Sequence, residues 1–122
     1  MAAAFSRRLL SRLLLSRRTS RKDKPVEVDV QVISLGKDVA WVTLPAEVFV
    51  ELGLNIKAAS PFRQTSVISL ANGMYHYIPD RASYSGGVYE DIRCRFAEGT
   101  GEMLVTTALR LLAEIRAEAS KE

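Results

Sequence analysis

Residues 26–32 read "VEVDVQV", a stretch in which an apolar side chain recurs at every second position. A β-strand turns successive side chains to opposite faces, so this spacing predicts a strand with one buried face and one polar face. The Gly-containing turn "LGKD" and a second apolar run at residues 39–44 follow. The two runs together predict a β-hairpin.

Helical and extended patterns alternate in the rest of the chain. Apolar residues at helical spacing follow Pro45, which predicts a helix that Pro45 begins and Pro61 ends. The run "TSVISLA" at residues 65–71 predicts an inner strand. The following stretch, up to residue 90, is rich in Tyr and Gly and predicts a long loop.

A C-terminal helix completes the series. After "EGTGE" the apolar residues return at helical spacing and predict one apolar side: Leu104, Leu109, Leu111, Leu112 and Ile115. The predicted fold class is α/β of the mixed α+β kind, with the order hairpin, helix, inner strand, long Tyr/Gly loop and C-terminal helix. Functional groups on such a scaffold are expected where strands end and loops begin.

The charge of the chain is divided unevenly. Residues 1–24 hold eight Lys or Arg against Asp23 alone, whereas residues 25–122 hold nine against thirteen Asp or Glu. The net charge of +3 therefore hides a basic leader at residues 1–24 and a mildly acidic body at residues 25–122. Nucleic-acid binding needs clustered cations on the folded surface, so we expect no nucleic-acid partner for the body.

The leader is rich in Arg, Ser and Leu, and its leucines recur at the four-residue spacing of a helix. This composition is compatible with a mitochondrial-type targeting helix, and also with a basic surface helix or the remnant of a longer domain. Arg12 and Arg17 interrupt the leucines, so the leader does not fit a standard secretory signal. No apolar run is long enough for a transmembrane segment, and Cys94 has no second cysteine for a disulfide.

Polar side chains follow the two apolar runs that we expect to be inner strands. Glu47 comes directly after residues 39–44, and the Tyr-rich loop comes directly after residues 65–71. If the two strands are neighbours, Glu47 can face Tyr77. From the residues alone, Glu47 in a first helical turn more often serves the helix dipole, and His76, as a lone loop histidine, more often makes a local hydrogen bond.

Two segments resemble a known family. The runs "VQVISLGKDVAWVTLPAEVFVELGLNIK" and "SVISLANGMYHYIPDRASYSGG" resemble the later part of the catalytic domain of the neutral/alkaline (non-lysosomal) ceramidases, most closely the bacterial ceramidase-like hydrolases. The resemblance covers about residues 28–112. It rests on a Pro-x-Glu element and an Asn-containing loop with a tyrosine, in the same order as in the family.

The resemblance implies zinc-dependent hydrolysis of an N-acyl lipid amide. It assigns Glu47 and Tyr77 as two Zn²⁺ ligands, beside two histidines that the family carries earlier in the domain. Carboxylate and phenolate oxygens complement imidazoles around Zn²⁺, and the metal can polarise an amide carbonyl or activate water. Tyr84, Tyr89 and His76 are the candidates for positions next to the substrate.

The sequence departs from the family pattern in several places. Ala46 replaces the glycine before the glutamate, Met74 stands at the first tyrosine of the loop, and Val88 separates Gly87 from Tyr89. The family's two histidine ligands and its serine lie upstream of the segments that match. We therefore expect a fragment of a ceramidase-like amidohydrolase that is inactive by itself.

The alternative is a non-enzymatic small α/β module that binds a partner or associates with itself. A partial domain exposes sheet edges, so self-association through such an edge is expected.

Overall fold

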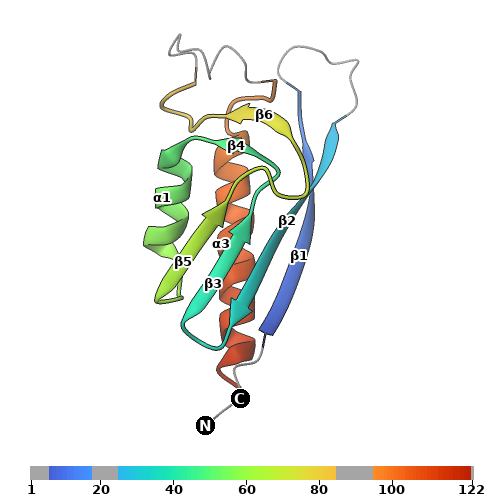
Figure 1. Ribbon diagram of the computed structural model, residues 1–122. Coiled ribbons are helices and arrows are strands. Elements are labelled where there is room, and N and C mark those ends of the chain that lie inside the picture. The colour runs from blue at the N-terminus through green and yellow to red at the C-terminus, as the bar shows by residue number, and fades with distance from the viewer. Residues whose placement is uncertain (1–5, 18–24, 85–94, 122) are drawn as a thin grey trace.

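The computed structural model describes residues 6–17, 25–84 and 95–121 of the 122-residue chain. Within these ranges the chain forms a four-stranded sheet in the order β1-β2-β3-β5 and a two-stranded sheet of β4 and β6 (Figure 1). Two helices complete the fold, which confirms the predicted mixed α/β class. The strands of the larger sheet are β1 (Ser6–Leu15), β2 (Val26–Leu35), β3 (Val39–Thr43) and β5 (Gln64–Ile68).

The predicted hairpin is confirmed. β2 and β3 pair in antiparallel register, and Gly36 in the turn between them adopts a φ of 65°, a conformation that glycine accepts without strain. The alternation read from residues 26–32 sets the two faces of β2, because Val28, Val30 and Val32 are buried and Glu27, Asp29 and Gln31 are not. β5 then pairs with β3 in parallel register, so the two predicted strands are neighbours. β5 is not the inner strand that was expected at residues 65–71, because it is the last strand in the sheet order and none of its residues is buried.

The helix expected in the leader is wrong. Residues 6–15 form β1, which pairs with β2 along its whole length in antiparallel register. Leu9 and Leu13 face the core beside Val32 and Val28, and Leu15 is completely buried. A separation of four residues returns a side chain to the same face in a strand as well as in a helix, so the leucine spacing suited both structures.

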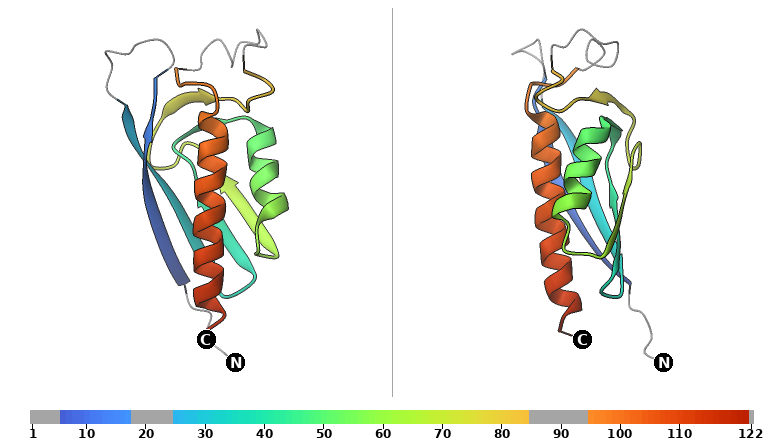
Figure 2. Two further views of the ribbon diagram at one scale, coloured as in Figure 1. Left: turned by 180° about the vertical axis from the view of Figure 1, so that it is seen from behind. Right: turned by 90° about the vertical axis from the view of Figure 1, so that its left-hand side faces the viewer.

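Both helices lie on the same face of the four-stranded sheet. Figure 2 shows α1 (Val50–Ala59) and α3 (Thr100–Ala119) side by side in one layer, with the sheet behind them. The predicted apolar side of the C-terminal helix packs inward: Leu104, Leu111, Leu112 and Ile115 are buried and Leu109 is partly buried against the same core. None of the helices in the described ranges is long and apolar enough to cross a membrane.

The small sheet of β4 (Ala46–Val48) and β6 (Tyr75–Ile78) corrects two sequence-based predictions. The segment after Pro45 was expected to be helical, but it first pairs as β4, and α1 begins only at Val50. The Tyr-rich stretch was expected to be entirely loop, but part of it forms β6. β4 and β6 are parallel partners of each other. Local sequence patterns do not reveal a pairing between two short segments that are distant in the sequence.

The backbone of α3 lies close to its neighbours at Gly101. A Cβ added there would lie 2.5 Å from Leu52 Cδ1 and 2.6 Å from the carbonyl oxygen of Pro79. Gly53, in α1, has no such constraint, because the nearest atom to its added Cβ is the Cβ of Val67 at 4.0 Å. Both glycines lie in helices but only Gly101 is crowded, so the same substitution at the two positions isolates the effect of close packing.

We expect Gly101→Ala to lower the free energy of unfolding by about 1–3 kcal/mol, because the methyl group overpacks the junction of α3, α1 and the end of β6. Gly53→Ala should raise the free energy of unfolding by up to about 1 kcal/mol, since alanine favours the helix and meets no close atom. Urea unfolding followed by circular dichroism measures both changes. Equal effects of the two substitutions would show that the close approach at Gly101 is not present.

Candidate functional site

Glu47 and Tyr77 are adjacent across the small sheet. β3 and β5 run parallel, so both chain segments that leave them emerge at the same end of the larger sheet. There they pair again as β4 and β6, and Glu47 lies in register with Tyr77. The two residues are therefore neighbours across the small sheet, although Glu47 belongs to a strand and not to a first helical turn.

An irregularity in β6 determines which tyrosine lies beside Glu47. Ala46 pairs with Tyr75 and Glu47 with Tyr77, so His76 is an extra residue between two successive pairs. Such a bulge changes which way the following side chains point. Tyr75 lies with the buried Ala46 and packs edge-on against Phe96, with ring centroids 6.2 Å apart. Tyr77 instead lies with Glu47.

Backbone hydrogen bonds fix the loop that delivers β6 to β4. The amides of Leu70, Ala71 and Tyr75 donate to the carbonyl oxygens of Ala46, Leu44 and Pro45, at 3.2, 3.0 and 2.9 Å. Two loop residues, Leu70 and Asn72, have positive φ angles of 55° and 62°. Asparagine tolerates this conformation, whereas for leucine it is costly and persists only where the surroundings enforce it.

Glu47 and Tyr77 line the same open hollow. Its volume is about 500 Å³, and its wall is formed by Glu47, Val48, Phe49, Val50, Glu51, Ser69 and Tyr77. Three neighbouring apolar residues and a set of oxygen-bearing side chains thus share one cavity. Sequence analysis missed Glu51 and Ser69. Ser69 directly follows β5, and Glu51 lies in the first turn of α1, the helix that follows β4. Such positions beyond strand ends are the signal that could have identified them.

The described residues do not form a complete set of metal ligands. Among residues 6–17, 25–84 and 95–121, no group of three or more His, Cys, Asp or Glu side chains could hold a metal ion. A carboxylate and a phenolate are chemically suitable for Zn²⁺, but protein zinc sites use three or four protein ligands. Glu47 and Tyr77 therefore fit part of a zinc site.

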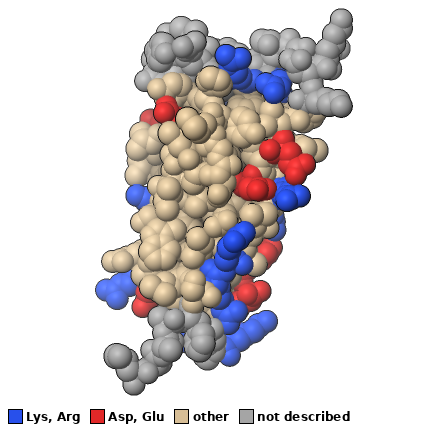
Figure 3. Space-filling model, turned by 45° about the vertical axis from the view of Figure 1, so that its right-hand side comes forward, with Lys and Arg blue, Asp and Glu red and all other residues tan. Residues whose placement is uncertain are grey.

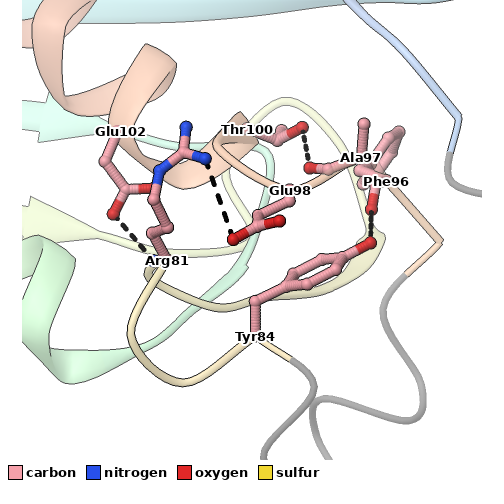
Figure 4. Close-up of polar contacts among 7 residues, drawn as sticks. All are labelled: Arg81, Tyr84, Phe96, Ala97, Glu98, Thr100 and Glu102. Carbon is pink, nitrogen blue, oxygen red and sulfur yellow. Dashed lines mark hydrogen bonds and ion pairs between the residues drawn. The ribbon is translucent and has the colours of Figure 1, made fainter.

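The remaining candidates lie elsewhere. His76 is exposed in β6 and is not among the residues that line the hollow. Tyr84 donates a hydrogen bond from its hydroxyl to the carbonyl oxygen of Phe96 at 3.1 Å (Figure 4). Neither residue shares the cavity of Glu47 and Tyr77. Tyr89 falls outside the described residues.

The segment around Tyr84 is tied to the beginning of α3. Figure 4 shows the Arg81 guanidinium beside Glu98, at 3.7 Å, while the Arg81 backbone amide donates to Glu102 Oε2 at 2.9 Å. Thr100 Oγ1 donates to the carbonyl oxygen of Ala97 at 2.7 Å. These contacts connect the segment after β6 to the residues at the beginning of α3.

Two solved structures have a similar fold. Neutral ceramidase from Pseudomonas aeruginosa aligns with a TM-score of 0.68 and 18% sequence identity over 82% of this chain and 17% of that chain. A ceramidase complexed with C2 aligns with a TM-score of 0.67 and 19% identity, over 80% of this chain and 17% of that one. No family model and no curated protein matches the sequence.

The chain has the fold of one part of neutral ceramidase. This likeness confirms the family resemblance at the level of the fold. The chain spans about a sixth of the length of the solved ceramidases that it matches.

The position of Tyr84 leads to a stability prediction. We expect Tyr84→Phe to lower the free energy of unfolding by about 1 kcal/mol, because the Phe96 carbonyl loses a hydrogen-bond donor. Tyr84→Leu should cost more, since it also removes a ring that packs against the core cluster. Thermal or urea unfolding measures both variants. A Tyr84→Phe protein as stable as the parent would contradict a structural role for the hydroxyl.

Proposed function

We propose that this chain forms part of a zinc-dependent, ceramidase-like amide hydrolase, to which Glu47 and Tyr77 contribute two metal ligands. One observation carries the proposal: the two residues that the family resemblance singles out lie in register on adjacent strands and line one open hollow. They are thirty residues apart in the sequence, and the pairing of β4 with β6 brings them together as two ligands of one metal would have to be. The fold likeness to neutral ceramidase supports the same assignment.

The chemistry of the two side chains suits the proposed role. Glu47 supplies a carboxylate and Tyr77 a phenol oxygen, both hard donors that bind Zn²⁺. When bound, the metal would polarise an amide carbonyl or lower the pKa of a bound water. The chain's own contribution is to fix the two oxygens on paired strands, whose backbone positions the hydrogen bonds of residues 70, 71 and 75 hold in place.

The substrate class follows from the resemblance and is compatible with the hollow. We propose an N-acyl amide of a sphingoid-type lipid as the substrate of the complete site. Val48, Phe49 and Val50 give the hollow an apolar wall beside Glu47 and Tyr77, and an apolar wall with a few convergent polar groups is the usual form of a site for an amphipathic small molecule.

The imidazole of His76 does not line the hollow, so we propose that the nitrogen ligands come from outside the described residues. Zinc bound by two oxygens alone leaves coordination positions unfilled, and the family fills them with histidines. We therefore propose that another segment or another chain completes the centre, and that the 122-residue chain alone does not hydrolyse amides.

A cobalt titration tests the ligand assignment directly. Co²⁺ accepts the same ligands as Zn²⁺ and absorbs visible light when its coordination is tetrahedral. We expect the chain to bind Co²⁺ weakly and to show stronger visible absorption when imidazole is added, because imidazole supplies the nitrogen donors. Glu47→Gln and Tyr77→Phe should each lower the Co²⁺ affinity at least about tenfold, since even changes to residues behind the ligands have effects of that size.

His76→Gln is the matched control, because His76 lies on the same strand but does not line the hollow. This variant should keep the parent affinity and absorption. Urea unfolding of all variants establishes that they remain folded. Equal Co²⁺ binding by the parent and both ligand variants, or a loss confined to His76→Gln, would contradict the assignment.

A further inference from the structure

Apart from its three arginines, β1 is an edge strand without the features that normally prevent edge pairing. Its ten residues pair with β2 on one side, and no other described strand lies on its outer side. Residues 6–15 contain no proline, no glycine and no bulge. A long regular edge of this kind presents unpaired backbone donors and acceptors to another strand.

The outward side chains of β1 are a mixture of leucine and arginine. Leu10 and Leu14 are 40% and 60% exposed, which is high for leucines in a sheet. Arg12 lies between Glu27 and Asp29, at 3.6 and 3.5 Å, so its charge is balanced within the chain. Figure 3 brings this side forward and shows basic and acidic side chains together beside a broad uncharged surface.

We propose that a second copy of this chain adds its β1 to this edge in antiparallel register, with Ser11 opposite Ser11 on a two-fold axis. The axis stands perpendicular to the sheet. The two four-stranded sheets then form one continuous sheet, with the helices of both copies on the same face. This arrangement is the isologous type of interface, in which one surface meets itself.

The sequence of β1 selects this register. With Ser11 at the centre, residues 7–15 of the two copies pair, and each arginine faces a leucine: Arg8 faces Leu14 of the second copy and Arg12 faces Leu10 of the second copy. Leu9 faces Leu13 of the second copy on the core side. The leucines thus cover the aliphatic stems of the arginines.

The neighbouring registers are less favourable. A centre at Leu10 places Arg8 opposite Arg12 of the second copy, and a centre at Arg12 places that arginine opposite itself. Like charges directly opposite one another oppose strand pairing. Centres at Leu9 and Leu13 avoid such pairs, but they pair only residues 6–12 and residues 11–15. The strand is therefore self-complementary about Ser11, so a second copy of this chain fits it as a partner.

The proposed pairing is independent of the candidate metal centre. None of the residues that line the hollow lies on β1 or β2. The state of association can therefore be measured without reference to zinc or to hydrolysis, and failure of either proposal leaves the other unaffected.

Sedimentation equilibrium of the full chain gives the first test. We expect a reversible dimer with twice the chain mass of 13.5 kDa. Leu14→Arg should weaken it on the order of tenfold, because the new arginine faces Arg8 of the second copy and the two-fold axis repeats this contact. A parent chain that stays monomeric at its highest soluble concentration, or that forms open-ended polymers, would overturn the proposal.

A charge reversal tests the register. In the double variant Leu14→Arg with Arg8→Glu, opposite charges face each other, so the dimer should return. Leu14→Arg with Arg12→Glu should remain weakened, because residues 14 and 12 face each other only in the register centred on Leu13. Restoration by Arg12→Glu and not by Arg8→Glu would overturn the Ser11 register.

Ile68→Arg is the control for the other edge of the sheet. Ile68 is 43% exposed on β5, comparable to Leu10 on β1. This variant should dimerise like the parent, and circular dichroism of every variant confirms that the fold is retained. Dissociation of the Ile68→Arg protein would locate the interface away from β1 and contradict the proposal.

Discussion

The parallel pairing of β3 with β5 is the constraint on which the rest of the arrangement depends. Parallel neighbours need a crossover connection, and α1 within that connection lies over the sheet. The same pairing makes the chain leave both strands in one direction. The segments that follow them can therefore pair as β4 and β6, and the candidate site is formed at this second pairing.

Packing of α3 against the sheet and against α1 stabilises this arrangement. α3 contacts β1, β2 and α1, so one helix connects the beginning of the described chain to the crossover. Arg7 of β1 reaches Glu118 at 3.5 Å and Ser11 accepts a hydrogen bond from Arg110 at 2.9 Å, both at the α3 surface. Such exposed contacts contribute little individually, so the buried leucines between them supply most of the stabilisation.

The spacing of apolar residues predicted a strand or a helix correctly where that spacing fits only one of the two structures. The alternation at residues 26–32 identified β2, and the apolar side of residues 104–115 identified α3. The leucines of β1 did not, because a spacing of four is common to both structures. β4 and β6 were missed for a different reason: each is short and owes its conformation to a partner that is distant in the sequence. Glu47 and Tyr77 could be named from resemblance, but their shared hollow, with Glu51 and Ser69, needed the three-dimensional pairing.

The extra residue in β6, His76, affects the site through its presence in the chain and not through its side chain. Tyr75 and Tyr77 are two positions apart and would point the same way in a regular strand, yet one packs on Phe96 and the other lies beside Glu47. The number of residues between Asn72 and Tyr77 is therefore what directs Tyr77 toward the hollow, and the imidazole of His76 is incidental to it. A substitution at position 76 therefore leaves this geometry intact, whereas a deletion there would turn Tyr77 away from Glu47.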